Sequence, residues 1–254
     1  EGVETAIKAA RKWGYDVKGI PSGKAKIVVC SQNFHGRTTT IVGFSSDKVS
    51  KKGFEPFSGG FDPIPFGDVK ALENAIDEHT CAFLVEPIQG EAGIVVPPKG
   101  YLKAVQKICQ ERNVLLILDE VQTGVGRTGK NFAFQYEIDK PDALIVGKAI
   151  GGGAFPVSAF VAKKEVMDVS SSGSHGSTWG GNPLGMAIAH ESLCVLEDEN
   201  LAEKSAKLGE YLMKELKKIK SPLVKEVRGK GLFVGLELKE SAKSLCLKLL
   251  HKGI

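Results

Sequence analysis

Short apolar runs bounded by turn residues recur along the chain and alternate with amphipathic segments. Runs of this kind are typical of strands that are covered on both faces of a sheet, and the amphipathic segments have the spacing of helices packed by one face. We expect strands at 25–30, 81–86, 114–118, 143–146 and 156–162, and helices at 2–14, 68–78, 100–112 and 183–196. This alternation predicts an α/β fold with a mostly parallel sheet.

The alternation stops near residue 200, where a charged helix at 201–218 is followed by two strands joined at Gly229 to Gly231 and by the start of a last helix. The sequence therefore predicts a large α/β domain over 1–200 and the beginning of a smaller domain over 201–254. Helical patterns reach both ends of the chain, and there is no initiating Met. We therefore expect the chain to be a fragment of a longer protein.

Composition narrows the possible functions. Apolar residues make up 42% of the 254 residues, and the net charge is only +4 without a basic stripe, so nucleic acid is not an expected partner. No apolar run approaches the roughly 20 residues of a membrane span. Five scattered cysteines and five scattered histidines show no metal-ligand spacing, so we expect no metal site. A reducing, cytoplasmic location is expected, with the mitochondrial matrix left open because the true N-terminus is not shown.

Two of the expected strands lead directly into residues whose side chains can take part in a reaction. The run at 114–118 ends on Asp119, and the run at 143–146 ends on Gly147 and Lys148. Parallel sheets bind ligands at the carboxyl ends of their strands, so an acid and an amine are delivered to one edge. Pyridoxal phosphate needs an amine for its Schiff base and an acid facing its pyridine nitrogen, and this pair suits it.

Glycines after Asp119 offer a competing interpretation. Residues 124–129 read GVGRTG, which matches the dinucleotide fingerprint, and with Lys130 the segment comes close to a phosphate loop. Both patterns require the first glycine directly after the strand, and the phosphate loop requires Ser or Thr where Asn131 stands. A nucleotide-binding oxidoreductase or NTPase using Gly124 to Lys130 is the alternative of another class, and a tight turn explains these glycines better.

Six segments carry a family resemblance, and they occur in order at 33–38, 86–93, 118–129, 147–153, 175–184 and 226–232. Together they resemble the ornithine-type branch of the class III pyridoxal-phosphate aminotransferases. The resemblance implies a fold-type-I transferase with a partial small α+β domain and a homodimer whose sites lie at the subunit interface. It also implies transfer of the δ-amino group of ornithine to 2-oxoglutarate. Acetylornithine and 4-aminobutyrate aminotransferases are the nearest alternatives.

The same resemblance assigns roles to single residues. Lys148 corresponds to the Schiff-base lysine and Asp119 to the acid that keeps the pyridine nitrogen protonated. Gln122 corresponds to the residue near the phenolic oxygen of the cofactor. Val121 and Phe34 correspond to the contacts on the two faces of its ring. An ordinary surface lysine and a strand-end cap are the structural alternatives for Lys148 and Asp119.

Three further residues are implied for phosphate and substrate. Thr178 corresponds to a phosphate ligand given across the dimer to the neighbouring site. Arg37 and Glu91 correspond to a pair in which Glu neutralises Arg in one half-reaction and releases it to bind a carboxylate in the other. A purely structural ion pair is the alternative. The family's phosphate-gripping turn and its α-carboxylate arginine are not in this sequence, so we expect these 254 residues alone to bind the cofactor poorly.

Overall fold

A six-stranded sheet forms the centre of the molecule. The computed structural model describes residues 1–254, and its sheet has the strand order β2-β1-β3-β4-β5-β6. The first five strands are parallel, and β6 runs antiparallel to β5 at one edge. The strands are β1 (Lys26–Cys30), β2 (Phe61–Ile64), β3 (Thr80–Val85), β4 (Leu115–Asp119), β5 (Ala143–Val146) and β6 (Ala159–Ala162). The α/β fold expected from the sequence is confirmed.

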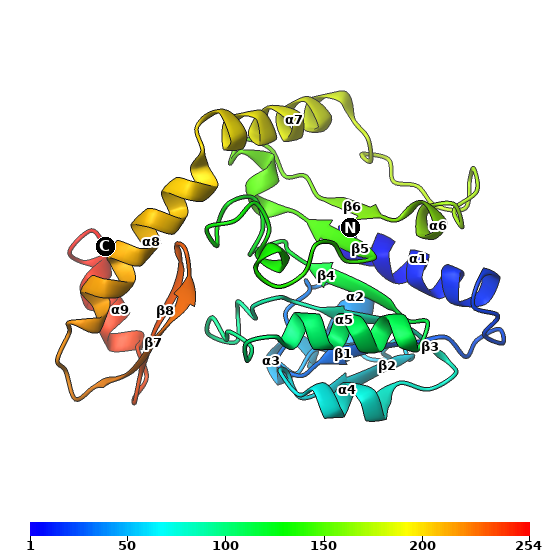
Figure 1. The fold of residues 1–254 in the computed structure, drawn as a ribbon, viewed down its shortest axis with the longest axis horizontal. Helices are drawn as coiled ribbons and strands as arrows, with labels where there is room; N and C mark the ends of the chain where they lie inside the picture. Colours follow the sequence, from blue (N-terminus) through cyan, green and yellow to red (C-terminus); the bar gives the residue numbers. More distant parts are fainter.

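Helices connect these strands and cover the sheet on both faces (Figure 1). Their bounds are α1 (Gly2–Asp16), α2 (Thr39–Phe44), α3 (Lys48–Lys51), α4 (Val69–Ala75), α5 (Tyr101–Glu111), α6 (Lys164–Met167) and α7 (Pro183–Asp198), with the 3-10 helices η1 (Ala133–Tyr136) and η2 (Lys148–Gly151). Side chains cap the first turns of α4 and α7, because the Asp68 carboxylate accepts from Ala71 N and the Asn182 side chain accepts from Gly185 N.

Alternate residues of the strands supply two separate cores. In β3, Ala82 and Leu84 pack with α1, whereas Phe83 and Val85 pack with α4 and α5. All six β3 residues are therefore buried, as expected of a strand covered on both faces. Cys30, Cys81 and Cys109 are buried free thiols within these cores. None of the helices combines the length and the apolar character that crossing a lipid bilayer demands.

The C-terminal part of the chain gathers at one end of the molecule, where α8 (Leu201–Lys217) and α9 (Lys243–Leu250) lie with a two-stranded sheet (Figure 1). Strands β7 (Val224–Lys230) and β8 (Phe233–Leu238) pair antiparallel. Helix α8 approaches their turn so closely that a Cβ on Gly209 would lie 2.1 Å from the Gly231 carbonyl oxygen. Glycine at 209 therefore permits this packing.

One strand was not expected. The sequence predicts no strand between those at 25–30 and 81–86, but Phe61–Ile64 form β2, which pairs with β1. The segment holds Pro63, and proline is tolerated in β2 because this strand lies at the sheet edge. The expected strand at 156–162 is shorter, at 159–162, and is the antiparallel edge strand on the other side.

Candidate active site

The carboxyl ends of two neighbouring strands bring Asp119 and Lys148 to one cavity. Asp119 is the last residue of β4 and lies opposite Ile145 of β5, and Lys148 begins η2 two residues after β5 ends. The cavity has a volume of about 180 Å³, and its lining includes Phe34, Val121 and Gln122 as well. Five of the eight residues expected at the site therefore share one cavity.

The backbone at Lys148 is unusual. Its φ is +46°, in the left-handed region that a residue with a side chain rarely adopts. The preceding Gly147 packs closely, because a Cβ there would lie 3.2 Å from the Val121 Cγ1 atom. Strained backbone of this kind is concentrated at functional sites, where surrounding packing enforces it. The Lys148 side chain is exposed and open to a ligand.

Asp119 is held by a histidine. The His35 Nδ1 atom lies 2.7 Å from Asp119 Oδ2, both side chains are buried, and Val121 N donates to Asp119 Oδ1 at 3.0 Å. Burial alone would lower the pKa of His35, but the hydrogen bond and the charge of Asp119, with Glu86 nearby, raise it above its ordinary value. Because a carboxylate oxygen accepts, the His35 Nδ1–H is the donor in this contact.

Glu86 lies beside this pair at the end of β3. Its Oε2 accepts from Phe34 N at 3.1 Å and its Oε1 accepts from Gly90 N at 3.2 Å. Burial raises the pKa of Glu86 to about 7, and the Asp119 charge adds to this, while His35 and the two amide donors oppose it. Glu86 therefore joins the loop that carries Phe34 to the loop after β3.

Arg37 and Glu91 do not form an ion pair in this structure, and their expected alternation between half-reactions stays a prediction. Glu91 Oε1 instead accepts a hydrogen bond from Gln122 Nε2 at 2.8 Å. The Arg37 guanidinium carbon lies 5.6 Å from the centre of the Phe34 ring. Both long side chains are exposed, so nearby groups determine where each lies. Glu91 is thereby linked to the cavity through Gln122, and Arg37 is next to Phe34.

Thr178 lies outside the cavity. It belongs to an exposed loop between α6 and α7, whose neighbours His175, Gly176 and Ser177 line a different pocket, at the start of α1. The expectation for Thr178 concerned a neighbouring subunit, so a single chain does not test it.

The glycines at 124–129 do not form a nucleotide loop. Turns occupy the segment after β4, and the next helical element is the short η1, so the helix that both nucleotide motifs require is absent. A Cβ on Gly126 would lie 2.7 Å from Leu196 of α7, and one on Gly129 would lie 3.0 Å from Ala206 of α8. These glycines allow the turn to pack under α7 and α8.

Glu120 stabilises that turn from within. This fully buried carboxylate accepts from Thr123 Oγ1 at 2.6 Å, from Ala133 N at 2.9 Å and from Phe134 N at 2.8 Å. Burial raises the pKa of Glu120 to about 6, although these three hydrogen bonds oppose the shift. Sequence reasoning missed both Glu86 and Glu120. The signal was available, since Glu86 ends the expected strand at 81–86 and Glu120 follows Asp119 after the expected strand at 114–118.

The cavity suits pyridoxal phosphate by its donor set. It offers a primary amine, Lys148, a buried carboxylate, Asp119, an aromatic side chain, Phe34, and an aliphatic one, Val121. These are the groups that would hold the aldehyde, the pyridine nitrogen and the two ring faces of the cofactor. In addition, His35 Nε2 is buried without a hydrogen-bond partner, so the cavity wall has an unused polar atom.

Comparison with known sequences agrees with this donor set. The aminotransferase class-III family matches residues 1–254. The chain is 54% identical over 254 residues to the ornithine aminotransferases of Brevibacillus brevis and of Bacillus subtilis. All of the chain is aligned, but it spans only 64% and 63% of these two relatives.

Solved structures of aminotransferases also match this chain. An ornithine aminotransferase from Toxoplasma gondii superposes with a TM-score of 0.98 at 44% identity, covering 100% of this chain and 62% of that one. An acetylornithine aminotransferase from Elizabethkingia anophelis superposes with a TM-score of 0.88 at 49% identity, covering 100% of this chain and 64% of that one. With the family match over its whole length, the chain belongs to the class-III aminotransferases.

Proposed function

We propose that the protein is a pyridoxal-phosphate-dependent ornithine δ-aminotransferase. It would transfer the δ-amino group of ornithine to 2-oxoglutarate and form glutamate-5-semialdehyde and glutamate. The observation that carries the proposal is the shared cavity of Lys148 and Asp119 at the ends of β4 and β5. The choice of ornithine is supported by the relatives of that name at 54% identity.

We propose a distinct role for each residue that lines the cavity. When bound, pyridoxal phosphate supplies an electron-withdrawing ring that stabilises negative charge at the carbon bearing the substrate amine. Lys148 would bind the cofactor aldehyde, and its amine would then move the proton at that carbon. Asp119, with His35 donating to it, would keep the pyridine nitrogen protonated. Phe34 and Val121 would hold the ring between them, and Gln122 would bind the phenolic oxygen.

Arg37 and Glu91 are proposed for substrate recognition. Arg37 is exposed beside Phe34 and makes no ion pair, so its guanidinium is available for a substrate carboxylate. Glu91 is held at the cavity by Gln122 and offers a carboxylate to a substrate amine. Since Glu91 is hydrogen-bonded to Gln122 and Arg37 lies beside Phe34, we propose separate roles for the two residues here. Neutralisation of Arg37 by Glu91 in one half-reaction stays a prediction.

Assembly and domain division are also proposals. We propose a homodimer in which Thr178 serves the phosphate of the neighbouring site, and its position in an exposed loop outside its own cavity supports this. We propose a division near residue 200, and the gathering of α8, α9 and the hairpin at one end supports it (Figure 1). The curated relatives named above are bacterial, which favours a cytoplasmic location over a mitochondrial one.

Acetylornithine is the second candidate amino donor. The acetylornithine aminotransferase from Elizabethkingia anophelis shares 49% identity with this chain, more than the 44% of the Toxoplasma gondii ornithine enzyme. Donor specificity of the full-length protein decides between them. With 2-oxoglutarate as acceptor, ornithine should give a kcat/KM at least about tenfold above those of acetylornithine and 4-aminobutyrate. A preference for either of these would overturn the choice of ornithine, and turnover of no amino donor would overturn the proposed reaction.

A further inference from the structure

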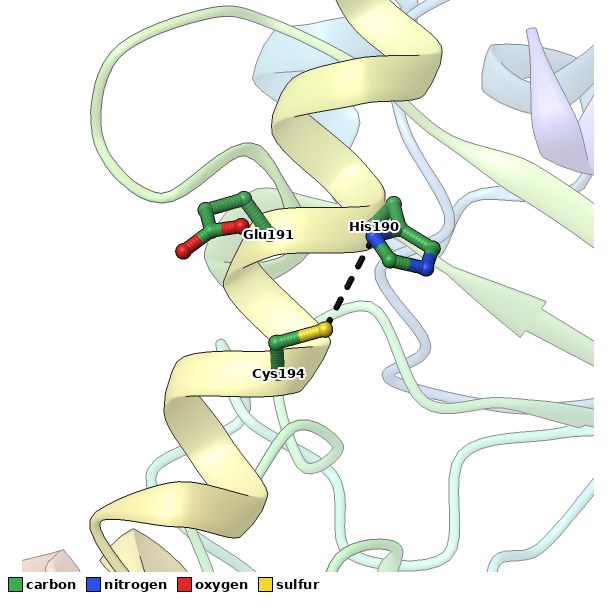
Figure 2. Close-up of side chains that lie close together, drawn as sticks. All are labelled: His190, Glu191 and Cys194. Atoms are coloured by element: carbon green, nitrogen blue, oxygen red, sulfur yellow. Dashed lines mark hydrogen bonds between the residues drawn. The ribbon is translucent and has the colours of Figure 1, made fainter.

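Three chemically different side chains meet on the outer surface of α7, away from the Lys148 cavity. Figure 2 shows the His190 and Cys194 side chains directed toward each other, with Glu191 projecting from the other side of the same turn. Their ligand atoms all lie within 4.8 Å of one another, and the Cys194 Sγ atom lies 3.7 Å from His190 Nδ1. Residues three and four apart are neighbours on a helix, so one turn of α7 brings the three together.

These distances suit a tetrahedral metal ion. With a metal–nitrogen bond of about 2.0–2.1 Å and a metal–sulfur bond of about 2.3 Å, two ligands at the tetrahedral angle lie roughly 3.6 Å apart. The separation of 3.7 Å between His190 Nδ1 and Cys194 Sγ is close to this value without rearrangement. The Glu191 carboxylate lies within 4.8 Å of both atoms and would reach the ion by rotation of its exposed side chain, which leaves the fourth ligand position to solvent.

The chemistry of the set selects a class of metal. One imidazole, one thiolate and one carboxylate favour borderline transition-metal ions such as Zn²⁺ and Co²⁺ over Mg²⁺ and Ca²⁺, which prefer oxygen ligands alone. No lysine or arginine is paired with Glu191, whereas the exposed Glu199 farther along is paired with Lys204 at 3.5 Å. The Glu191 carboxylate is therefore free to bind a cation.

We propose that His190, Glu191 and Cys194 form a binding site for a zinc-class divalent metal ion, with solvent as the fourth ligand. On binding, the Cys194 thiol gives up its proton to solvent and its sulfur bonds to the metal, so one proton is released for each ion bound. The sequence pattern did not indicate this site, because a single His and a single Cys four residues apart match no metal motif.

The position of the site gives it a structural consequence. Ser192, within the same turn of α7, faces η2, since a Cβ on Gly152 would lie 2.7 Å from its Oγ atom. The element η2 begins with Lys148. A metal bound across this turn would restrain the part of α7 that packs against η2. Binding should therefore raise the thermal unfolding midpoint of the protein.

Cobalt titration of the full-length protein tests the site. Co²⁺ bound by Cys194 should give a near-ultraviolet thiolate-to-cobalt absorption, which Zn²⁺ removes by competition and Mg²⁺ does not. Cys194→Ser should abolish the absorption. His190→Ala should lower the affinity at least about tenfold, since losing even an indirect partner of a metal ligand costs about 10–100-fold. Glu191→Gln should weaken binding as well.

The matched control is Cys246→Ser, because Cys246 is the other cysteine outside the core and lies on α9. This variant should leave the cobalt absorption and affinity unchanged. The proposal is overturned if no thiolate absorption develops with Co²⁺, if it persists in Cys194→Ser, or if Cys246→Ser abolishes it. Equal affinity of the parent protein and His190→Ala would also overturn it.

Discussion

The His35 Nδ1 atom and the Asp119 Oδ2 atom lie 2.7 Å apart in the interior of the protein. His35 comes from the loop after β1, and Asp119 ends β4, two strands away. The contact joins the Asp119 carboxylate to a loop that follows a different strand. Asp119 is therefore held in place before any ligand binds, as effective electrostatic catalysis requires.

Replacing the acid tests this arrangement. Asp119→Asn keeps the shape but removes the charge, so a bound pyridine nitrogen would lose its proton. In the full-length enzyme kcat should fall by on the order of 100-fold or more. His35→Gln, which can still donate to Asp119, should cost on the order of tenfold, with a shift in the pH at which the cofactor absorbance changes. Equal activity of Asp119→Asn and the parent would contradict the role of Asp119.

The buried carboxylate of Glu120 predicts a pH dependence of stability. Its pKa is raised from 4.5 to about 6 in the folded state, so between these values the folded protein binds the proton more tightly than the unfolded chain does. The tighter proton binding of Glu120 therefore stabilises the folded protein fully below about pH 4.5. This stabilisation, on the order of 2 kcal/mol, is lost as the pH rises through about 6.

Glu120→Gln removes this titration but leaves at least one of three donors without an acceptor, which costs about 1–3 kcal/mol. The free energy of unfolding of the variant should therefore be lower than that of the parent, and the difference should narrow between pH 4.5 and 7. Urea denaturation at a series of pH values measures this. A difference that stays constant with pH would show that Glu120 does not titrate in this window.

Arg228 connects the hairpin to the loop that carries Glu91. Its Nη2 atom donates to the Gly93 carbonyl at 2.7 Å, its Nε atom donates to the Ile94 carbonyl at 3.0 Å, and its Nη1 atom pairs with Glu226 at 2.8 Å. Arg228→Lys keeps the charge but not the planar set of donors. We expect the free energy of unfolding to fall by about 1–3 kcal/mol and amide hydrogen exchange over residues 90–95 to become faster. Arg112→Lys, a change at an exposed arginine, should alter neither the free energy of unfolding nor hydrogen exchange over residues 90–95.

Close packing of α8 on the hairpin turn predicts a sensitive glycine. A Cβ at position 209 would meet the Gly231 backbone at 2.1 Å, and backbone cannot move aside as a flexible side chain does. Gly209→Ala should lower the free energy of unfolding by about 3 kcal/mol or more, the upper range of overpacking. Gly59→Ala is the control, because its Cβ would meet nothing within 4 Å. Similar midpoints in thermal unfolding for both variants would refute the packing described here.

Much of the sheet could be predicted because buried parallel strands are short apolar runs with turns at their ends. The same rule located Asp119 and Lys148, since strand ends meet at one edge. The pattern did not predict strand β2, because its sequence FDPI has no apolar run and its pairing depends on the neighbouring β1. Tertiary contact, and not local pattern, makes that segment a strand.

Partners of individual side chains were harder to predict than their location. Glu91 pairs with Gln122 and not with Arg37, since long exposed side chains respond to whichever groups lie near them. Glu120 depends on amide donors at Ala133 and Phe134, which reach it only after the intervening turn has folded. Periodicity carries no information about such contacts.

The most direct test of the account is the covalent position of the cofactor. The full-length protein is incubated with pyridoxal phosphate, reduced with borohydride, digested and analysed by mass spectrometry, with Lys148→Ala as the matched variant. We predict one phosphopyridoxyl group on Lys148, absent from the variant. A modified lysine elsewhere with Lys148 unmodified, or no modification at all, would contradict the assignment of this cavity as the active site.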